Sequence, residues 1–261
     1  MDALLAIEGL SAGYGSTPVL RGVDCEVRAG ELWAVLGPNG TGKSTLLRSV
    51  LGVMPWTRGG VRLLGRERRE WEARALARHV AWVPQGFESA EGFRGLELVL
   101  MGRSPHLGLW GLHSASDEAL ARAALEELGV ASLAERPCEA MSGGERRMVM
   151  LARGLVQQPA LLLLDEPTAF LDLAHQVVAL ERVRARVEEG LGAVAVLHDV
   201  NLAAAFATHA LLLRDGRVLA RGPAAEVLER ERLEALYGLP LEAARAPSGA
   251  RLFAPRAGRP R

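Results

Sequence analysis

Short, mostly apolar runs alternate with amphipathic stretches along much of this 261-residue chain. Apolar runs of this length predict buried parallel strands, and apolar side chains at helical spacing, as over residues 173–187, predict helices between them. Because strands and helices alternate, we expect an α/β fold with a mostly parallel sheet flanked by helices. The four predicted strands are Leu32–Leu36, His79–Val83, Leu161–Leu164 and Ala193–Leu197.

Three regions depart from this alternation. Residues 4–10 and 19–27 predict an N-terminal antiparallel β layer, because turn residues separate two strand-like runs. The pattern turns mainly helical after Gly86, so we expect a helical subdomain, about residues 86–158, inserted into a domain of residues 1–242. Residues 243–261 combine prolines and arginines without apolar periodicity. They are predicted to form a disordered basic tail.

Composition narrows the choice of function. A hydrophobic content of 49% can supply a sizeable core, and a formal net charge of +0 provides no overall field that would attract nucleic acid. The longest weakly polar stretch, Asn201–Leu213, is well short of the roughly 20 residues of a membrane-spanning helix. The first ten residues contain no basic leader. We therefore expect a cytoplasmic protein that does not itself cross a membrane.

A glycine-rich segment follows the first predicted buried strand and opens a helix. It fits the pattern G-x-x-x-x-G-K-[ST], in which backbone N–H groups surround phosphate oxygens and the lysine reaches the β- and γ-phosphates. Lys43 is the single lysine among 31 basic side chains, which indicates that arginine cannot replace it. The predicted ATP-binding residues are Gly37, Pro38, Asn39, Gly40, Thr41, Gly42, Lys43, Ser44 and Thr45, with the Ser44 hydroxyl as a Mg²⁺ ligand.

Polar residues follow three of the other predicted strands. Asp165 ends an apolar run and is expected to hold Mg²⁺, while Glu166, one residue later, is expected to orient or deprotonate the attacking water. Gln85 and His198 occupy comparable positions. Ligands of parallel α/β sheets bind beyond the carboxyl ends of the strands. We therefore predict that Gln85, Glu166, His198 and Lys43 act together on one nucleotide, with Gln85 also a metal ligand.

Residues 141–145, Met-Ser-Gly-Gly-Glu, precede another predicted helix. Taken alone, Ser142 and Glu145 form a capping box, and the helix start could also bind an anion. Together with the phosphate-binding segment, they resemble the signature of ATP-binding-cassette ATPases over residues 4–240. The resemblance implies that the signature (Ser142, Gly143, Gly144 and Glu145) faces ATP bound by a second copy of the chain, that Tyr14 stacks on adenine, and that Gln85, Asp172 and His198 are the Q-loop, D-loop and switch residues.

The sequence departs from the commonest family pattern at Met141, at Arg147, where glutamine is frequent, and at Ala169-Phe170. These changes remove no catalytic group, but they leave the details of dimer contacts open.

Two further segments, residues 102–108 and 168–172, are similar to importer ATPases for iron-siderophore, haem and cobalamin uptake. That class implies transmembrane permease subunits, a substrate-binding protein and a position at the cytoplasmic face of the inner membrane. No neighbouring carboxylate or thiol supports a metal site at His106 and His113.

A soluble ATP-gated clamp, working on nucleic acid or cofactor assembly, is the alternative. Such proteins commonly carry two cassettes or a long insertion, whereas this chain has one phosphate-binding segment, one signature and no basic, aromatic-rich patch. The sequence therefore favours transport without nucleic acid as a partner.

Overall fold

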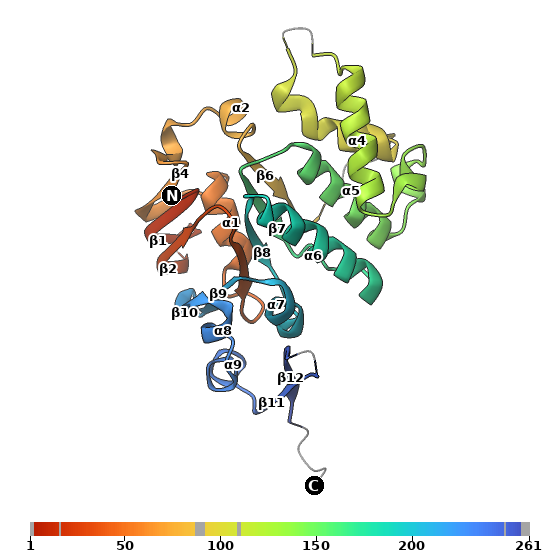
Figure 1. Ribbon diagram of the computed structural model, residues 1–261. Helices are drawn as coiled ribbons and strands as arrows, with labels where there is room; N and C mark the ends of the chain where they lie inside the picture. The colour runs from red at the N-terminus through yellow and green to blue at the C-terminus, as the bar shows by residue number, and fades with distance from the viewer. Residues whose placement is uncertain (1–2, 16, 87–91, 109–110, 248, 257–261) are drawn as a thin grey trace. The chain divides into compact units, whose positions relative to one another are not determined.

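The computed structural model describes residues 3–15, 17–86, 92–108, 111–247 and 249–256. The chain divides into two compact units. The first unit comprises Met1–Arg69 and Val194–Arg261, and the second comprises Glu70–Ala193. The two units are described separately below, with the elements labelled in Figure 1.

The first unit opens with a four-stranded antiparallel sheet in the order β2-β1-β4-β5. Its strands alternate buried and exposed positions because only one face is covered, and this confirms the predicted N-terminal β layer. Glycines with positive φ, among them Gly9 and Gly22, lie where the register of β1 and β2 shifts. The strands are β1 (Leu5–Tyr14), β2 (Thr17–Val27), β4 (Trp56–Leu63) and β5 (Arg66–Glu67).

The same unit contains the strand that leads into the phosphate-binding segment. Every residue of β3 (Leu32–Leu36) is buried, and β3 runs parallel to β9 (His209–Arg214), with Trp33 opposite His209 and Leu36 opposite Leu212. An antiparallel partner, β10 (Arg217–Pro223), follows β9. Helix α1 (Lys43–Leu51) follows β3, as predicted. The remaining helices of this unit are α7 (Val200–Phe206), α8 (Ala224–Val227) and α9 (Arg230–Tyr237).

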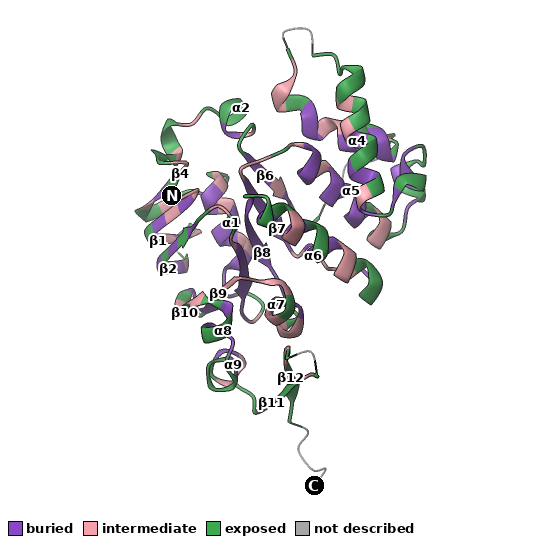
Figure 2. Ribbon diagram, viewed as in Figure 1, coloured by how far each residue is buried: buried purple, intermediate pink, exposed green. Residues whose placement is uncertain are grey.

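Strand β8 (Gly192–Val196) begins in the second unit and ends in the first. In the first unit it neighbours β3. In the second unit β6 (Val80–Val83) and β7 (Leu161–Asp165) pair in parallel, with Val80 opposite Leu161 and Val83 opposite Leu164. Parallel pairing is therefore confirmed for the predicted strands at β3, β6 and β7, and β7 is buried along its whole length, as Figure 2 shows in purple.

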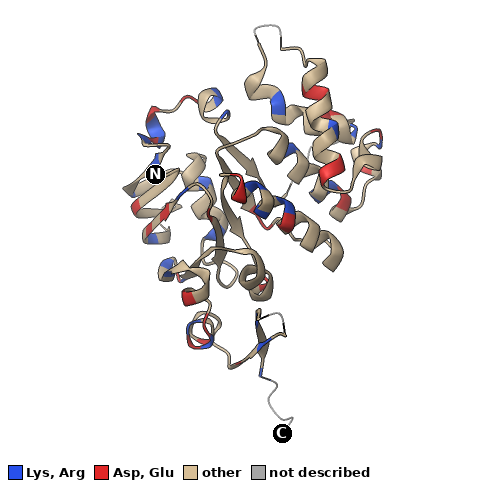
Figure 3. Cartoon of the chain, viewed as in Figure 1, with Lys and Arg blue, Asp and Glu red and all other residues tan. Residues whose placement is uncertain are grey.

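Helices make up most of the second unit. Acidic and basic residues both lie along the helices (Figure 3), and α4 and α6 contain the i,i+4 ion pairs Arg122–Glu118 and Arg184–Glu188. The longer helices are α3 (Gly95–Leu100), α4 (Ala115–Glu127), α5 (Gly143–Val156) and α6 (Leu173–Glu188), and α2 is Ala73–Leu76. The short 3₁₀ turns of this unit are η2 (Met101–His106), η3 (Ala131–Leu133) and η4 (Cys138–Ala140), and η1 (Arg68–Glu70) begins in the first unit. The inserted helical subdomain, residues 86–158, stays a prediction within this larger unit.

The weakly polar stretch Asn201–Leu213 is not one element, because it contributes to α7 and then to β9. Among the described residues, no helix combines the length and the apolar character needed to span a bilayer.

The prediction of a disordered tail from residue 243 is wrong for the described part of that segment. Strands β11 (Leu241–Arg245) and β12 (Arg251–Pro255) form an antiparallel hairpin, and residues 257–261 lie outside the described residues. Asn201 of α7 holds the hairpin, since its side chain donates to the Phe253 carbonyl at 3.1 Å and accepts from the Phe253 N–H at 2.8 Å. Each strand buries only one residue, Leu241 or Phe253, so no periodicity marks the hairpin in the sequence.

Substituting Asn201 tests this attachment. We expect Asn201→Ala to remove both hydrogen bonds to Phe253, at about 1 kcal/mol each, and to release the hairpin locally. Hydrogen exchange should then speed up in β11 and β12 but not in β3. The exposed Glu242→Ala on the same hairpin is the control. Unchanged protection in Asn201→Ala would contradict the attachment.

Candidate functional site

The phosphate-binding segment lies between β3 and α1 in the first unit. The Lys43 ammonium is buried, with 6% of the residue exposed, and donates to the carbonyls of Gly37 at 2.7 Å and Pro38 at 2.9 Å. The Thr41 hydroxyl also donates to the Pro38 carbonyl, at 2.9 Å. These bonds curl the loop around the lysine, as the sequence pattern requires.

Glycine is needed in this loop for space as well as conformation. A Cβ at Gly37 would lie 2.1 Å from the Leu213 carbonyl oxygen, and one at Gly42 would lie 2.7 Å from Leu20 Cδ2. Gly42 has φ +101°, in the left-handed region, and caps α1. The loop backbone therefore packs directly against β9 and β2.

The N-terminus of α1 differs from the other long helices. It has neither a side-chain cap nor an acidic residue in its first turn, whereas α4 and α5 have capping boxes and Asp172 caps α6. A helix start carries about half a positive charge and N–H groups that suit an anion. The residues here therefore fit the phosphates of ATP.

Two other predicted residues belong to the first unit. Tyr14 ends β1, is 55% exposed, and its hydroxyl lies 3.4 Å from the Arg48 guanidinium of α1. The exposed His198 follows β8, and the preceding Leu197 N–H donates to the Val35 carbonyl of β3 at 3.2 Å. His198 and the loop after β3 therefore lie at the same edge of the sheet.

The second unit brings Gln85 and Glu166 together. They follow the neighbouring parallel strands β6 and β7, and the Gln85 amide N–H donates to Glu166 Oε2 at 2.8 Å. Because the amide nitrogen is turned to Glu166, its oxygen Oε1 points elsewhere and can serve as a ligand. Asp165 is 1% exposed at the end of β7, and Glu166 has φ +54°, which a non-glycine residue rarely adopts.

Residues 142–145 form the predicted capping box at the start of α5. Glu145 N–H donates to Ser142 Oγ at 3.1 Å, and Ser142 N–H donates to Glu145 Oε2 at 2.7 Å. That hydrogen bond from Ser142, together with Arg136 at 2.7 Å, lowers the pKa of Glu145. The anion-binding role of this helix start stays a prediction.

Exposed apolar residues flank the signature. Phe170 is 83% exposed, and a Cβ at Gly144 would lie 2.9 Å from its carbonyl oxygen. Asp172 caps α6 by accepting the His175 N–H at 2.8 Å, and this bond lowers the pKa of the Asp172 carboxyl. The D-loop role of Asp172 likewise stays a prediction.

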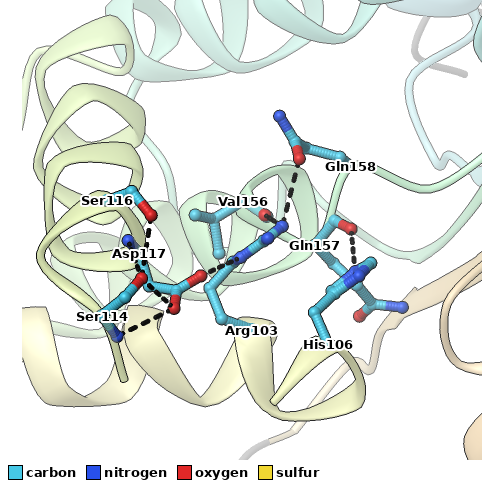
Figure 4. Close-up of polar contacts among 8 residues, drawn as sticks. All are labelled: Arg103, His106, Ser114, Ser116, Asp117, Val156, Gln157 and Gln158. Atoms are coloured by element: carbon cyan, nitrogen blue, oxygen red, sulfur yellow. Dashed lines mark hydrogen bonds and ion pairs between the residues drawn. The ribbon is translucent and has the colours of Figure 1, made fainter. Parts of the chain in front are cut away.

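The segment that suggested an importer, residues 102–108, has a structural task (Figure 4). The buried Arg103 donates to the carbonyl of Val156 at 3.0 Å and to Asp117 at 2.9 Å, and the His106 ring bonds to the Gln157 carbonyl at 2.9 Å. Two side chains of η2 therefore bind carbonyls at the C-terminal end of α5. Hydrogen bonds from Ser114, and then from Arg103, lower the pKa of Asp117.

Sequence reasoning noted Arg147 only as a departure from the family pattern and did not predict that it is buried. Its side chain donates to main-chain carbonyls at the ends of β6 and β7. A signal was available, because Arg147 lies one helical turn before Leu151 on the apolar stripe of α5. A charge on a buried face needs polar partners.

Comparison with known proteins places the chain in a family. The family model described as ABC transporter matches residues 20–169. The chain belongs to this family, and it is an ATP-binding subunit that hydrolyses ATP.

Individual relatives match almost the whole chain. A hemin import ATP-binding protein of Streptomyces coelicolor is 46% identical, covering 97% of this chain and 90% of the relative. An iron(3+)-hydroxamate import ATP-binding protein of Bacillus subtilis is 38% identical, covering 91% and 89%. A solved chain described as an inward-facing metal-chelate type ABC transporter superposes with a TM-score of 0.84 at 30% identity, covering 98% of both chains.

Exchanging the only lysine tests the phosphate loop. In Lys43→Arg the larger planar guanidinium does not fit between the Gly37 and Pro38 carbonyls, so we expect ATP affinity to fall by about tenfold or more. Titration with a fluorescent ATP analogue measures this, and thermal unfolding checks the fold. The surface change Arg62→Lys is the control. Wild-type affinity in Lys43→Arg would rule out the assigned role.

Proposed function

We propose that this chain energises an importer of iron chelates, either haem or a ferric siderophore, from the cytoplasmic face of the cell membrane. The names of the relatives, which include hemin and iron(3+)-hydroxamate import proteins, carry this proposal. The metal-chelate type transporter with the same fold supports it. The proposed partners are transmembrane permease subunits, with a substrate-binding protein in the full system, and no nucleic acid.

The proposed reaction is hydrolysis of ATP at its γ-phosphate. Lys43, the 37–42 loop and the start of α1 hold the phosphates, and Tyr14 stacks on adenine. Glu166 orients the attacking water and accepts its proton, while His198 stabilises the charge that develops on the γ-phosphate. Membership of the ABC transporter family supports the proposal that the phosphate-binding residues, Glu166 and His198 act on the same nucleotide.

Mg²⁺ is the proposed second component. Ser44, Gln85 and Asp165 would hold it, and their hydroxyl, amide and carboxylate oxygens are the donor types that Mg²⁺ prefers. When bound, Mg²⁺ neutralises charge on the β- and γ-phosphates.

We further propose that two copies of the chain enclose ATP. The residues Ser142, Gly143, Gly144 and Glu145 of each copy would then face the nucleotide held by the other. The capped N-terminus of α5 supports this proposal, because it presents glycine backbone beside an exposed apolar residue, Phe170. Binding ATP would close the dimer and hydrolysis would reopen it, driving the permease.

Replacing the proposed base separates binding from turnover. Glu166→Gln keeps the shape of the side chain but cannot accept a proton, so we expect ATP binding within about twofold of wild type and turnover reduced at least about 100-fold. Dimers should accumulate with ATP in size-exclusion chromatography. Glu188→Gln, exposed on α6, is the matched control and should behave as wild type. Normal steady-state turnover by Glu166→Gln would eliminate Glu166 as the base.

Isolation from native membranes tests the partners. We expect a tagged full-length chain, recovered in detergent, to bring with it a polytopic permease, encoded beside a binding protein for haem or a ferric siderophore. Binding of each chelate, and of cobalamin, to that protein identifies the cargo. Recovery of only soluble partners or nucleic acid would overturn the transport proposal and leave the ATPase standing.

A further inference from the structure

Arg147 on α5 uses both Nη groups of its guanidinium within the protein, while its Nε is buried without a hydrogen-bond partner among the described residues. It is 6% exposed, and burial lowers its pKa while the nearby Asp165 and Glu166 raise it. Each Nη nitrogen donates to two main-chain carbonyls. Nη1 contacts Pro84 and, at 3.1 Å, Gln85, and Nη2 contacts Asp165 and Glu166.

These carbonyls belong to the two strand ends that carry the proposed chemistry. Pro84 and Gln85 follow β6, and Asp165 and Glu166 close β7, its parallel neighbour. The side chains of Gln85 and Glu166 meet at 2.8 Å. One guanidinium therefore fixes the backbone on both sides of that contact.

Glu166 needs such a restraint because its φ of +54° lies in the left-handed region. For a residue with a Cβ, that conformation is unfavourable, and it persists only where neighbouring groups hold it. The hydrogen bond from Arg147 to the Glu166 carbonyl directly restrains the backbone of Glu166. Without it, the backbone can relax and move the carboxylate.

We propose that Arg147 is a positioning residue for ATP hydrolysis, which sets the location of the Glu166 carboxylate by clamping the carbonyls that follow β6 and β7. The inference rests on the proposed function of Glu166 as base. Arg147 touches no reacting atom, and its effect passes through the main chain. Because α5 begins at the capping box of Ser142, the clamp also ties the signature to the base within one unit.

Only arginine has the donors for this task. Its planar fork presents two Nη groups in fixed directions, one toward each strand end, whereas lysine has a single nitrogen and glutamine can serve only one strand. The glutamine that is frequent in the family at this position would therefore leave one strand end unclamped.

Three variants of the chain test the clamp. We expect kcat to fall about 10- to 100-fold in Arg147→Gln and in Arg147→Lys, because a base misplaced by about 1 Å can cost 10²-fold. The KM for ATP and the affinity for a fluorescent ATP analogue should stay within twofold. In Arg147→Ala, added methylguanidinium should restore part of kcat.

Arg103→Gln is the matched control, because Arg103 is also a buried arginine of this unit that binds a main-chain carbonyl, that of Val156. It should lower thermal stability without changing kcat of the folded protein. Measuring Glu166→Gln in parallel separates the two proposals. Should it keep normal turnover, the base assignment fails and the clamp fails with it.

Three outcomes overturn the clamp while leaving Glu166 as the base. The first is wild-type kcat in both Arg147→Gln and Arg147→Lys. The second is a kcat loss matched by Arg103→Gln. The third is failure of all Arg147 variants to fold, which would make Arg147 a residue of stability rather than of positioning.

Discussion

Parallel pairing of fully buried strands is the constraint on which the proposed chemistry depends. Parallel strands end at the same edge, so residues distant in sequence become neighbours once the strands pair. In the second unit, pairing of β6 with β7 brings Gln85 to 2.8 Å from Glu166. In the first unit, the bond from Leu197 to Val35 places His198 at the edge where the phosphate loop begins. Burial on both faces fixes this pairing, because a shift in register would expose leucines and unpair backbone groups.

The N-termini of α1 and α5 differ in how their backbone N–H groups are treated. Every helix leaves N–H groups without intrahelical partners at its N-terminus. In α5 the side chains of Ser142 and Glu145 satisfy two of them, whereas α1 follows Gly42 with no side-chain cap. The uncapped start suits phosphate, and the capped start holds its glycines rigidly for a nucleotide held by another copy, as proposed above. A glycine-rich turn precedes both α1 and α5, but only the N-terminus of α5 is capped by side chains.

Buried arginines connect elements of the second unit through main-chain carbonyls. Arg103 binds the end of α5, and Arg147 binds the ends of β6 and β7. A guanidinium is suited to this because it supplies several donors in one plane and keeps its charge when buried. The segment that resembles iron-chelate importers therefore has a visible structural role, independent of any cargo.

The sequence by itself determined the α/β class, the strands, the phosphate loop and the cap of α5, because each is encoded by residues close together in the chain. Tertiary structure alone decided the rest. The Arg147 contacts join residues 18 to 63 positions apart, and local patterns carry no information about such partners. The C-terminal hairpin escaped prediction for the same reason, since Asn201 holds Phe253 from 52 positions away. The physical cause is that one buried residue per strand, or one buried charge, does not produce a repeating hydrophobic pattern in the sequence.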